Sequence, residues 1–120
     1  MVELDPAHVV GAGGALGAVL RYLVTRRVDV GSLPAGTFLV NVVGSFVLAF
    51  VTFAGADSRM LLFVGTGACG SFTTFSSFSV ETVRLWESGD RGRAIGNAVG
   101  TLAGAVLAIG LAWLLTRPLS

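Results

Sequence analysis

Long apolar runs, separated by short charged stretches, divide the chain into four segments. These segments cover about residues 7–26, 35–56, 60–84 and 94–116. A helix needs about 20 mostly apolar residues to cross the hydrocarbon core of a bilayer, so the last three segments are long enough outright. The first is long enough only if Arg21 snorkels to the interface or faces protein. The pattern predicts an all-α membrane protein with four transmembrane helices in one domain, residues 1–120.

The third segment differs from an ordinary lipid-facing helix. No charged residue occurs from Met60 to Val80, yet the stretch 65–79 is crowded with glycine and hydroxyl side chains. Every backbone polar group in hydrocarbon needs a partner, so a glycine-rich and hydroxyl-rich break is tolerated only where it is buried in protein or lines a polar path. This composition predicts the working part of a transport or channel protein.

Composition supports the membrane class. Of the 120 residues, 53% are hydrophobic and 12% are charged, whereas a soluble domain has roughly 25% charged residues. The net charge of +1 gives no reason to expect a nucleic-acid partner, and the single cysteine allows no internal disulfide. The acidic start Met1–Pro6 does not resemble a secretory signal peptide, so we expect the first segment to be retained.

The arginines give only a weak orientation signal. Arg59 and Arg117 belong to the side that holds both termini, and four arginines belong to the opposite side: Arg26, Arg27, Arg91 and Arg93. Because cytoplasmic loops carry an excess of basic residues, this bias leans toward both termini outside. It is mild enough to permit insertion in both directions.

Small residues recur at four-residue spacing on two segments, at Gly13 and Gly17 and again at Gly96, Gly100 and Gly104. Such rows let helix backbones approach closely in lipid. They fit packing within the chain and a subunit interface equally well. Because four helices cannot easily surround a water-filled path alone, we expect an oligomer.

Polar side chains form stripes on the apolar segments. Thr37, Asn41 and Ser45 share one helical face, as do Asn97 and Thr101. Serine and threonine can bond to their own helix, but an asparagine amide has two donors and an acceptor to satisfy. Two intramembrane asparagines, each with a hydroxyl on the same stripe, therefore favour a polar track.

Aromatic and charged residues near the third segment have two readings each. Phe72, Phe75 and Phe78 are either packing residues or a stripe whose positive ring edges favour a dehydrated anion. Arg21 is either a functional intramembrane charge or a snorkelling anchor. Glu81 is either an entrance residue or the solvated end of a helix.

Three blocks of the sequence carry a family resemblance. Residues 14–22, 36–46 and 65–79 resemble, in order and spacing, the signature of the small dual-topology fluoride channels, and the third block is highly specific. The resemblance implies an antiparallel dimer of four-helix subunits with two fluoride pores. It also implies a broken third helix at the dimer centre.

The resemblance also implies roles for single residues. Backbone carbonyls of Gly70 and Thr73 from both subunits would hold a structural sodium ion. Arg21 and Glu81 would form the vestibule. The fluoride pore itself would be lined by the following residues: Phe75, Phe78, Asn41, Thr37, Ser76, Ser77, Ser79, Thr101 and Asn97. Asn97 departs from the pattern, because many relatives have a tyrosine there.

The resemblance predicts a channel of the cell membrane, embedded in lipid, that exports fluoride passively and so reduces its toxicity. Fluoride holds water tightly, so a narrow path must replace that water with amide, hydroxyl and ring-edge donors. The main alternative is a small dual-topology drug or cation exporter, but such antiporters need a membrane-embedded carboxylate and only Glu81 comes near. A non-conducting structural subunit is a second alternative. The partner is either a second copy in opposite orientation or an oppositely oriented paralogue.

Overall fold

The structure is a computed structural model that describes residues 5–28 and 35–119. Four helical stretches are long and apolar enough to cross a membrane: Pro6–Val28 (α1), Ala35–Phe53 (α2), Ser58–Glu87 and Arg91–Thr116 (α6). No strand occurs within the described ranges, so the predicted all-α class with four transmembrane helices is confirmed.

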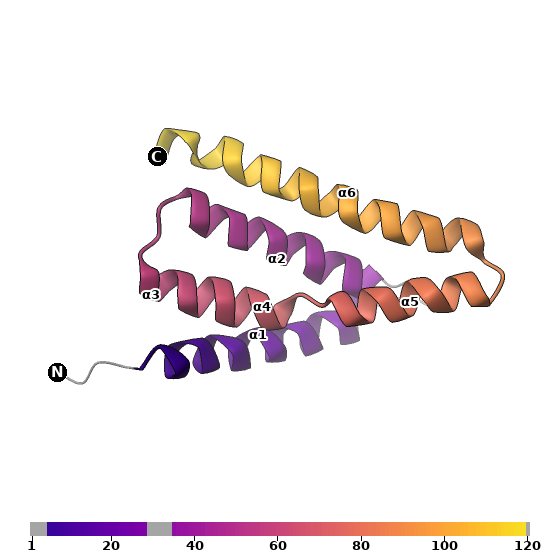
Figure 1. The fold of residues 1–120 in the computed structure, drawn as a ribbon, viewed down its shortest axis with the longest axis horizontal. Coiled ribbons are helices and arrows are strands. Elements are labelled where there is room, and N and C mark those ends of the chain that lie inside the picture. Colours follow the sequence, from indigo (N-terminus) through magenta and orange to yellow (C-terminus); the bar gives the residue numbers. More distant parts are fainter. Residues whose placement is uncertain (1–4, 29–34, 120) are drawn as a thin grey trace.

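The four stretches run alternately up and down, with the start of α1 and the end of α6 at the same end of the molecule (Figure 1). α2 lies between α6 and the third stretch, and α1 packs against the first half of that stretch. The second half extends beyond α1 and packs along the first half of α6. The turns at Gly55 and Gly89 have φ of 78° and 91°, values that glycine adopts without a steric penalty.

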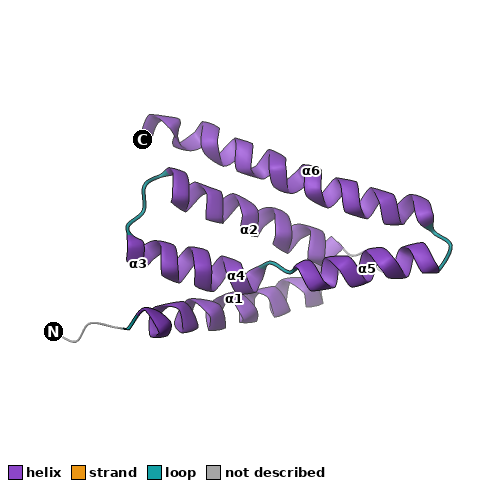
Figure 2. Cartoon of the chain, in the orientation of Figure 1, coloured by secondary structure: helices purple, strands orange, loops and turns teal. Residues whose placement is uncertain are grey.

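The third stretch is not one continuous helix. It comprises α3 (Ser58–Met60), a π-helical part η1 (Leu61–Cys69), α4 (Gly70–Phe72) and α5 (Phe75–Glu87). Between α4 and α5 the backbone is extended at Thr73, with ψ of 161°, and at Thr74, with ψ of 119°. Figure 2 shows this interruption as a loop inside the bundle.

Glycines bring α1 against the first half of the third stretch. A Cβ atom on Gly13 would overlap the carbonyl oxygen of Phe63, and one on Gly17 would overlap that of Ala68. This glycine row therefore packs within the chain. The row on α6 is mixed. A Cβ on Gly96 or Gly100 would meet nothing within 4 Å among the described residues, whereas one on Gly104 would meet Val42 of α2 at 2.9 Å.

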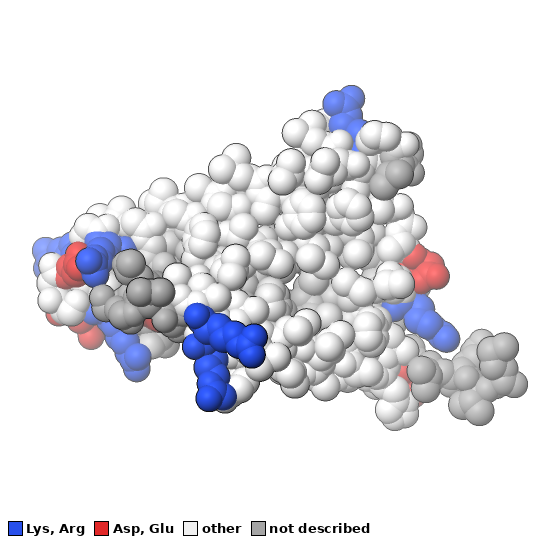
Figure 3. Space-filling model, turned by 180° about the vertical axis from the view of Figure 1, so that it is seen from behind, with Lys and Arg blue, Asp and Glu red and all other residues white. Residues whose placement is uncertain are grey.

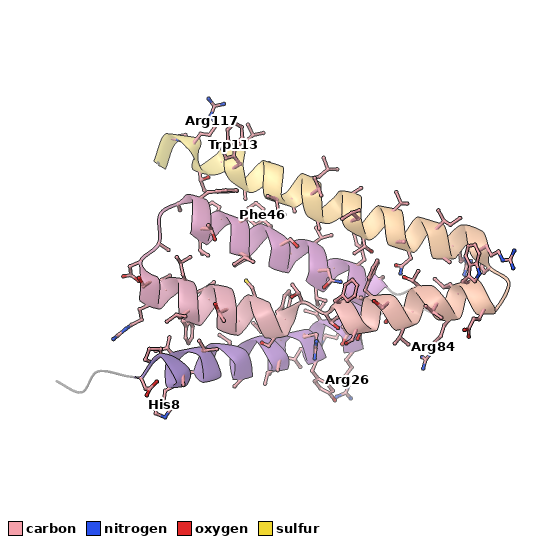
Figure 4. The ribbon with its side chains drawn as sticks, in the orientation of Figure 1. His8, Arg26, Phe46, Arg84, Trp113 and Arg117 are labelled. Atoms are coloured by element: carbon pink, nitrogen blue, oxygen red, sulfur yellow. The ribbon has the colours of Figure 1, made fainter. Side chains whose placement is uncertain are left out.

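Charged side chains lie at both ends of the molecule, with a further basic group set in from one end, and an uncharged band separates that group from the opposite end (Figure 3). At one end the guanidinium of Arg91 lies 4.8 Å from the ring of Trp86, and at the other Arg117 lies 4.8 Å from Trp113 (Figure 4). Tryptophan and arginine are typical of the headgroup level of a bilayer. The band and its two borders therefore match a membrane-spanning bundle.

Candidate functional site

The break between α4 and α5 is held by one side chain of α2. The Asn41 amide nitrogen donates to the Thr74 carbonyl oxygen at 3.0 Å, and the Thr74 amide donates to the Asn41 amide oxygen at 2.7 Å. Both polar groups of the Thr74 backbone are thus paired although they have left the helical ladder. The Thr74 hydroxyl then caps α5 by accepting from the Ser77 amide at 3.1 Å.

A cavity of about 320 Å³ opens beside the break. It is lined by Asn41 from α2, Phe75 and Phe78 from α5, and Thr101 from α6, together with other residues of these elements. The two phenyl rings lie 6.0 Å apart, centroid to centroid, and are tilted by 43°. The structure therefore brings these four predicted pore residues to one place. The ring of Phe75 is largely uncovered, because the residue is 80% exposed in the single chain.

The hydroxyl side chains predicted to line the pore differ in whether they already donate a hydrogen bond within the protein. Thr37 donates to the Glu81 carboxylate at 2.9 Å, and Ser79 donates to the Phe75 carbonyl at 2.9 Å. Their hydrogens are not available to an ion in this arrangement. Thr101 is different: it is 6% exposed, and its hydroxyl has no hydrogen-bond partner among the described residues.

A second, smaller cavity of about 240 Å³ lies along α5. Its lining residues are Ser76, Ser77, Val80, Glu81 and Arg84. The Ser77 hydroxyl makes no hydrogen bond within the described part of the chain, and Ser76 shares one with Thr74 at 3.3 Å. Figure 4 shows Arg84 projecting from α5 on the side away from α6. This cavity gathers hydroxyl donors next to both signs of charge.

Arg21, predicted as a vestibule residue, reaches the break itself. Its guanidinium donates to the Thr73 carbonyl oxygen at 3.4 Å and is partly buried. The neighbouring Gly70 carbonyl has lost the acceptor role it would have in a continuous helix, because the Thr74 amide bonds to Asn41 instead. The two main-chain carbonyls predicted to hold sodium therefore differ: Gly70 keeps helical dihedrals but lacks its usual donor, and Thr73 accepts from Arg21.

Asn97 lies outside both cavities. Its amide nitrogen donates to the Thr82 hydroxyl at 2.8 Å, which ties α6 to α5. Sequence reasoning missed this partner and also missed Thr74, whose position as an N-cap threonine after a glycine-rich run was the available signal. It missed Ser71 too, whose hydroxyl donates to the Gly14 carbonyl of α1 at 2.7 Å.

Comparison with known proteins gives consistent matches. The family model of CrcB-like protein, Camphor Resistance (CrcB), matches residues 8–113. The chain is 57% identical over 117 residues to fluoride-specific ion channel FluC 2 of Haloarcula marismortui, which covers 98% of both chains. It is 58% identical over 110 residues to fluoride-specific ion channel FluC 1 of Halobacterium salinarum, which covers 92% of both. A FluC of Thermotoga maritima is 47% identical over 96 residues, or 72% of this chain and 75% of that protein.

Proposed function

Because this chain belongs to the family of CrcB-like proteins, we propose that it is a fluoride-specific ion channel rather than an enzyme. It is a multi-pass integral membrane protein, as its four apolar helices and its relatives indicate. It lets fluoride leave the cell down its electrochemical gradient and so limits fluoride toxicity.

The observation that carries this proposal is the Thr101 hydroxyl. Buried polar groups almost always have a partner, and an orphaned one needs an explanation. Thr101 lines the same cavity as Phe75 and Phe78, whose positive ring edges also attract an acceptor, and its hydroxyl oxygen is buried just behind that lining. A small dehydrated anion in this cavity would satisfy the hydroxyl and contact the ring edges.

The side chains that line the two cavities suggest a path for the fluoride ion. Ser76 and Ser77 face the small cavity on α5, while Phe78 and Thr101 line the large one. Ser76, Ser77 and Phe78 lie within one turn of α5, so an ion would exchange water for hydroxyl donors before it meets the rings. Asn41 serves this path by holding the break from which Phe75 projects.

Efflux from liposomes tests the proposal. Purified protein should release fluoride, measured with a fluoride electrode, while chloride leaves far more slowly. A strict need for a proton gradient would support the drug or cation exporter instead, and no flux of any ion would support the structural subunit. Liposomes without protein set the background. Equal fluoride and chloride rates would also overturn the proposal.

An antiparallel dimer is part of the proposal. It is supported by the uncovered ring of Phe75 and by Gly96 and Gly100 of α6, where a Cβ would meet nothing within 4 Å among the described residues. Single-cysteine variants on a Cys69→Ala background should crosslink in an antiparallel arrangement and be labelled from both sides of the membrane. A parallel dimer would contradict this, and a fixed orientation without a homodimer would point to a paralogue as the partner.

A structural sodium ion completes the proposal. The Gly70 and Thr73 carbonyls of two subunits would hold it, and it would neutralise carbonyl lone pairs buried at the dimer centre. The bond from Arg21 to the Thr73 carbonyl engages only one of that oxygen's lone pairs. The purified dimer should resist thermal dissociation better in sodium than in an equal concentration of N-methylglucamine salt. Equal resistance in both salts would remove the sodium ion from the proposal.

A further inference from the structure

A short chain of hydrogen bonds links α6 to a pore residue of α5. The Asn97 amide donates to the Thr82 hydroxyl at 2.8 Å, and that hydroxyl donates to the Phe78 carbonyl oxygen at 2.7 Å. A hydroxyl has only one hydrogen, so Thr82 must accept from Asn97. The orientation of the Asn97 amide follows: its nitrogen faces Thr82 and its oxygen points elsewhere.

The two helices are antiparallel here, and the spacing on each is one turn. Phe78 lies four residues before Thr82 on α5, and Thr101 lies four residues after Asn97 on α6. Residues four apart share a helical face, so pairing Asn97 with Thr82 sets Phe78 opposite Thr101 one turn away. Both of these residues line the large cavity, whereas Asn97 does not.

We propose that Asn97 is a positioning residue, which acts through Thr82 to fix the distance between the Phe78 ring and the Thr101 hydroxyl. The inference rests on the proposed fluoride conduction and assigns Asn97 a role other than contact with the ion. α5 depends on such a tie, because it extends beyond α1 and none of its residues is buried (Figure 1). A small shift of α5 along α6 would widen the gap and admit a larger anion.

The expected effect is a loss of selectivity rather than of assembly. One neutral hydrogen bond contributes about 1 kcal/mol, which corresponds to roughly a five-fold change. Asn97→Leu and Thr82→Val should each lower the ratio of fluoride to chloride efflux by roughly five-fold, with the dimer retained on gel filtration. Thr82→Ser keeps both hydrogen bonds and should keep the wild-type ratio. Thr52→Val is the matched control, because Thr52 makes the same bond to its own helix, 2.7 Å to the Leu48 carbonyl, and is exposed.

A double-mutant cycle separates positioning from direct contact. If Asn97 acts only through Thr82, the double variant should be no worse than either single variant. A loss in Asn97→Leu much larger than in Thr82→Val, or additive losses, would mean that Asn97 contacts the ion and would overturn the proposal. Wild-type ratios in both single variants would overturn it as well. Absence of fluoride efflux from the wild type would instead reject the proposed function. The free energies of unfolding of the same four proteins, from denaturant titration, would still test whether Asn97 and Thr82 are coupled.

Discussion

Removing the Asn41 side chain should release the break in the third stretch. Asn41→Leu keeps a similar volume but deletes both bonds to Thr74, which is 8% exposed. The Thr74 amide and carbonyl then have no partner from α2. The local helical alternative would bond the Thr74 amide to the Gly70 carbonyl, so we expect α4 to extend toward α5 and to move Phe75.

The magnitude follows from the two groups left unpaired. Each buried backbone group without a partner costs about 1–3 kcal/mol, so the pair costs about 2–6 kcal/mol. Water entering the adjacent cavity of about 320 Å³ can satisfy part of this. We therefore expect a loss of about 2–3 kcal/mol, which is roughly a 30- to 150-fold change in the equilibrium between the broken and the altered segment.

Two measurements on the same preparation test this prediction. Fluoride efflux should fall by more than about ten-fold. The free energy of unfolding in detergent, from denaturant titration, should fall by about 2–3 kcal/mol. Thr52→Val is the matched control, because Thr52 lies farther along α2, outside the cavity, and its hydroxyl bonds to its own helix, 2.7 Å to the Leu48 carbonyl.

The outcomes discriminate between two roles of the amide. Wild-type stability and wild-type flux in Asn41→Leu would refute the prediction that Asn41 holds the break through its two hydrogen bonds to Thr74. Wild-type stability with abolished flux would show that the amide acts on the ion and not on the backbone. Asn41→Asp should behave like Asn41→Leu or worse, because it loses the donor to the Thr74 carbonyl and places a negative charge beside that oxygen.

Three further predictions concern the rings and the glycines. Phe75→Ile and Phe78→Ile keep bulk but remove the positive ring edge, so efflux should fall by at least about ten-fold with the dimer intact, whereas Phe72→Ile should change it little. Gly17→Ala should lower the free energy of unfolding by about 1–3 kcal/mol, because its Cβ would overlap the Ala68 carbonyl, and Gly11→Ala, with nothing within 4 Å, should not. A Cβ on Gly70 would meet its nearest neighbour within the chain at an ordinary 3.9 Å, so Gly70→Val should leave the helical content intact in circular dichroism. The added side chain should instead crowd the proposed subunit contact and abolish the dimer on gel filtration; a normal dimer would falsify the interface.

The sequence alone determined the number of helices, their approximate limits and the place where one of them is unusual. Hydrophobic length decides a transmembrane helix, and this property is local in the chain. A run of glycine and hydroxyl residues without charge at 65–79 likewise marked the segment whose helix is interrupted. The close packing of Gly13 and Gly17 was one of two readings that the spacing allowed.

Only the tertiary structure decided which partner each polar side chain has. Asn41 bonds to the backbone of Thr74 in the break of the third stretch, Thr37 bonds to Glu81, and Asn97 bonds to Thr82. A hydroxyl or amide can pair with its own helix, a neighbouring helix or an ion, and sequence spacing does not distinguish these choices. The choice depends on the register and rotation of packed helices, which are set by interactions between segments far apart in the chain.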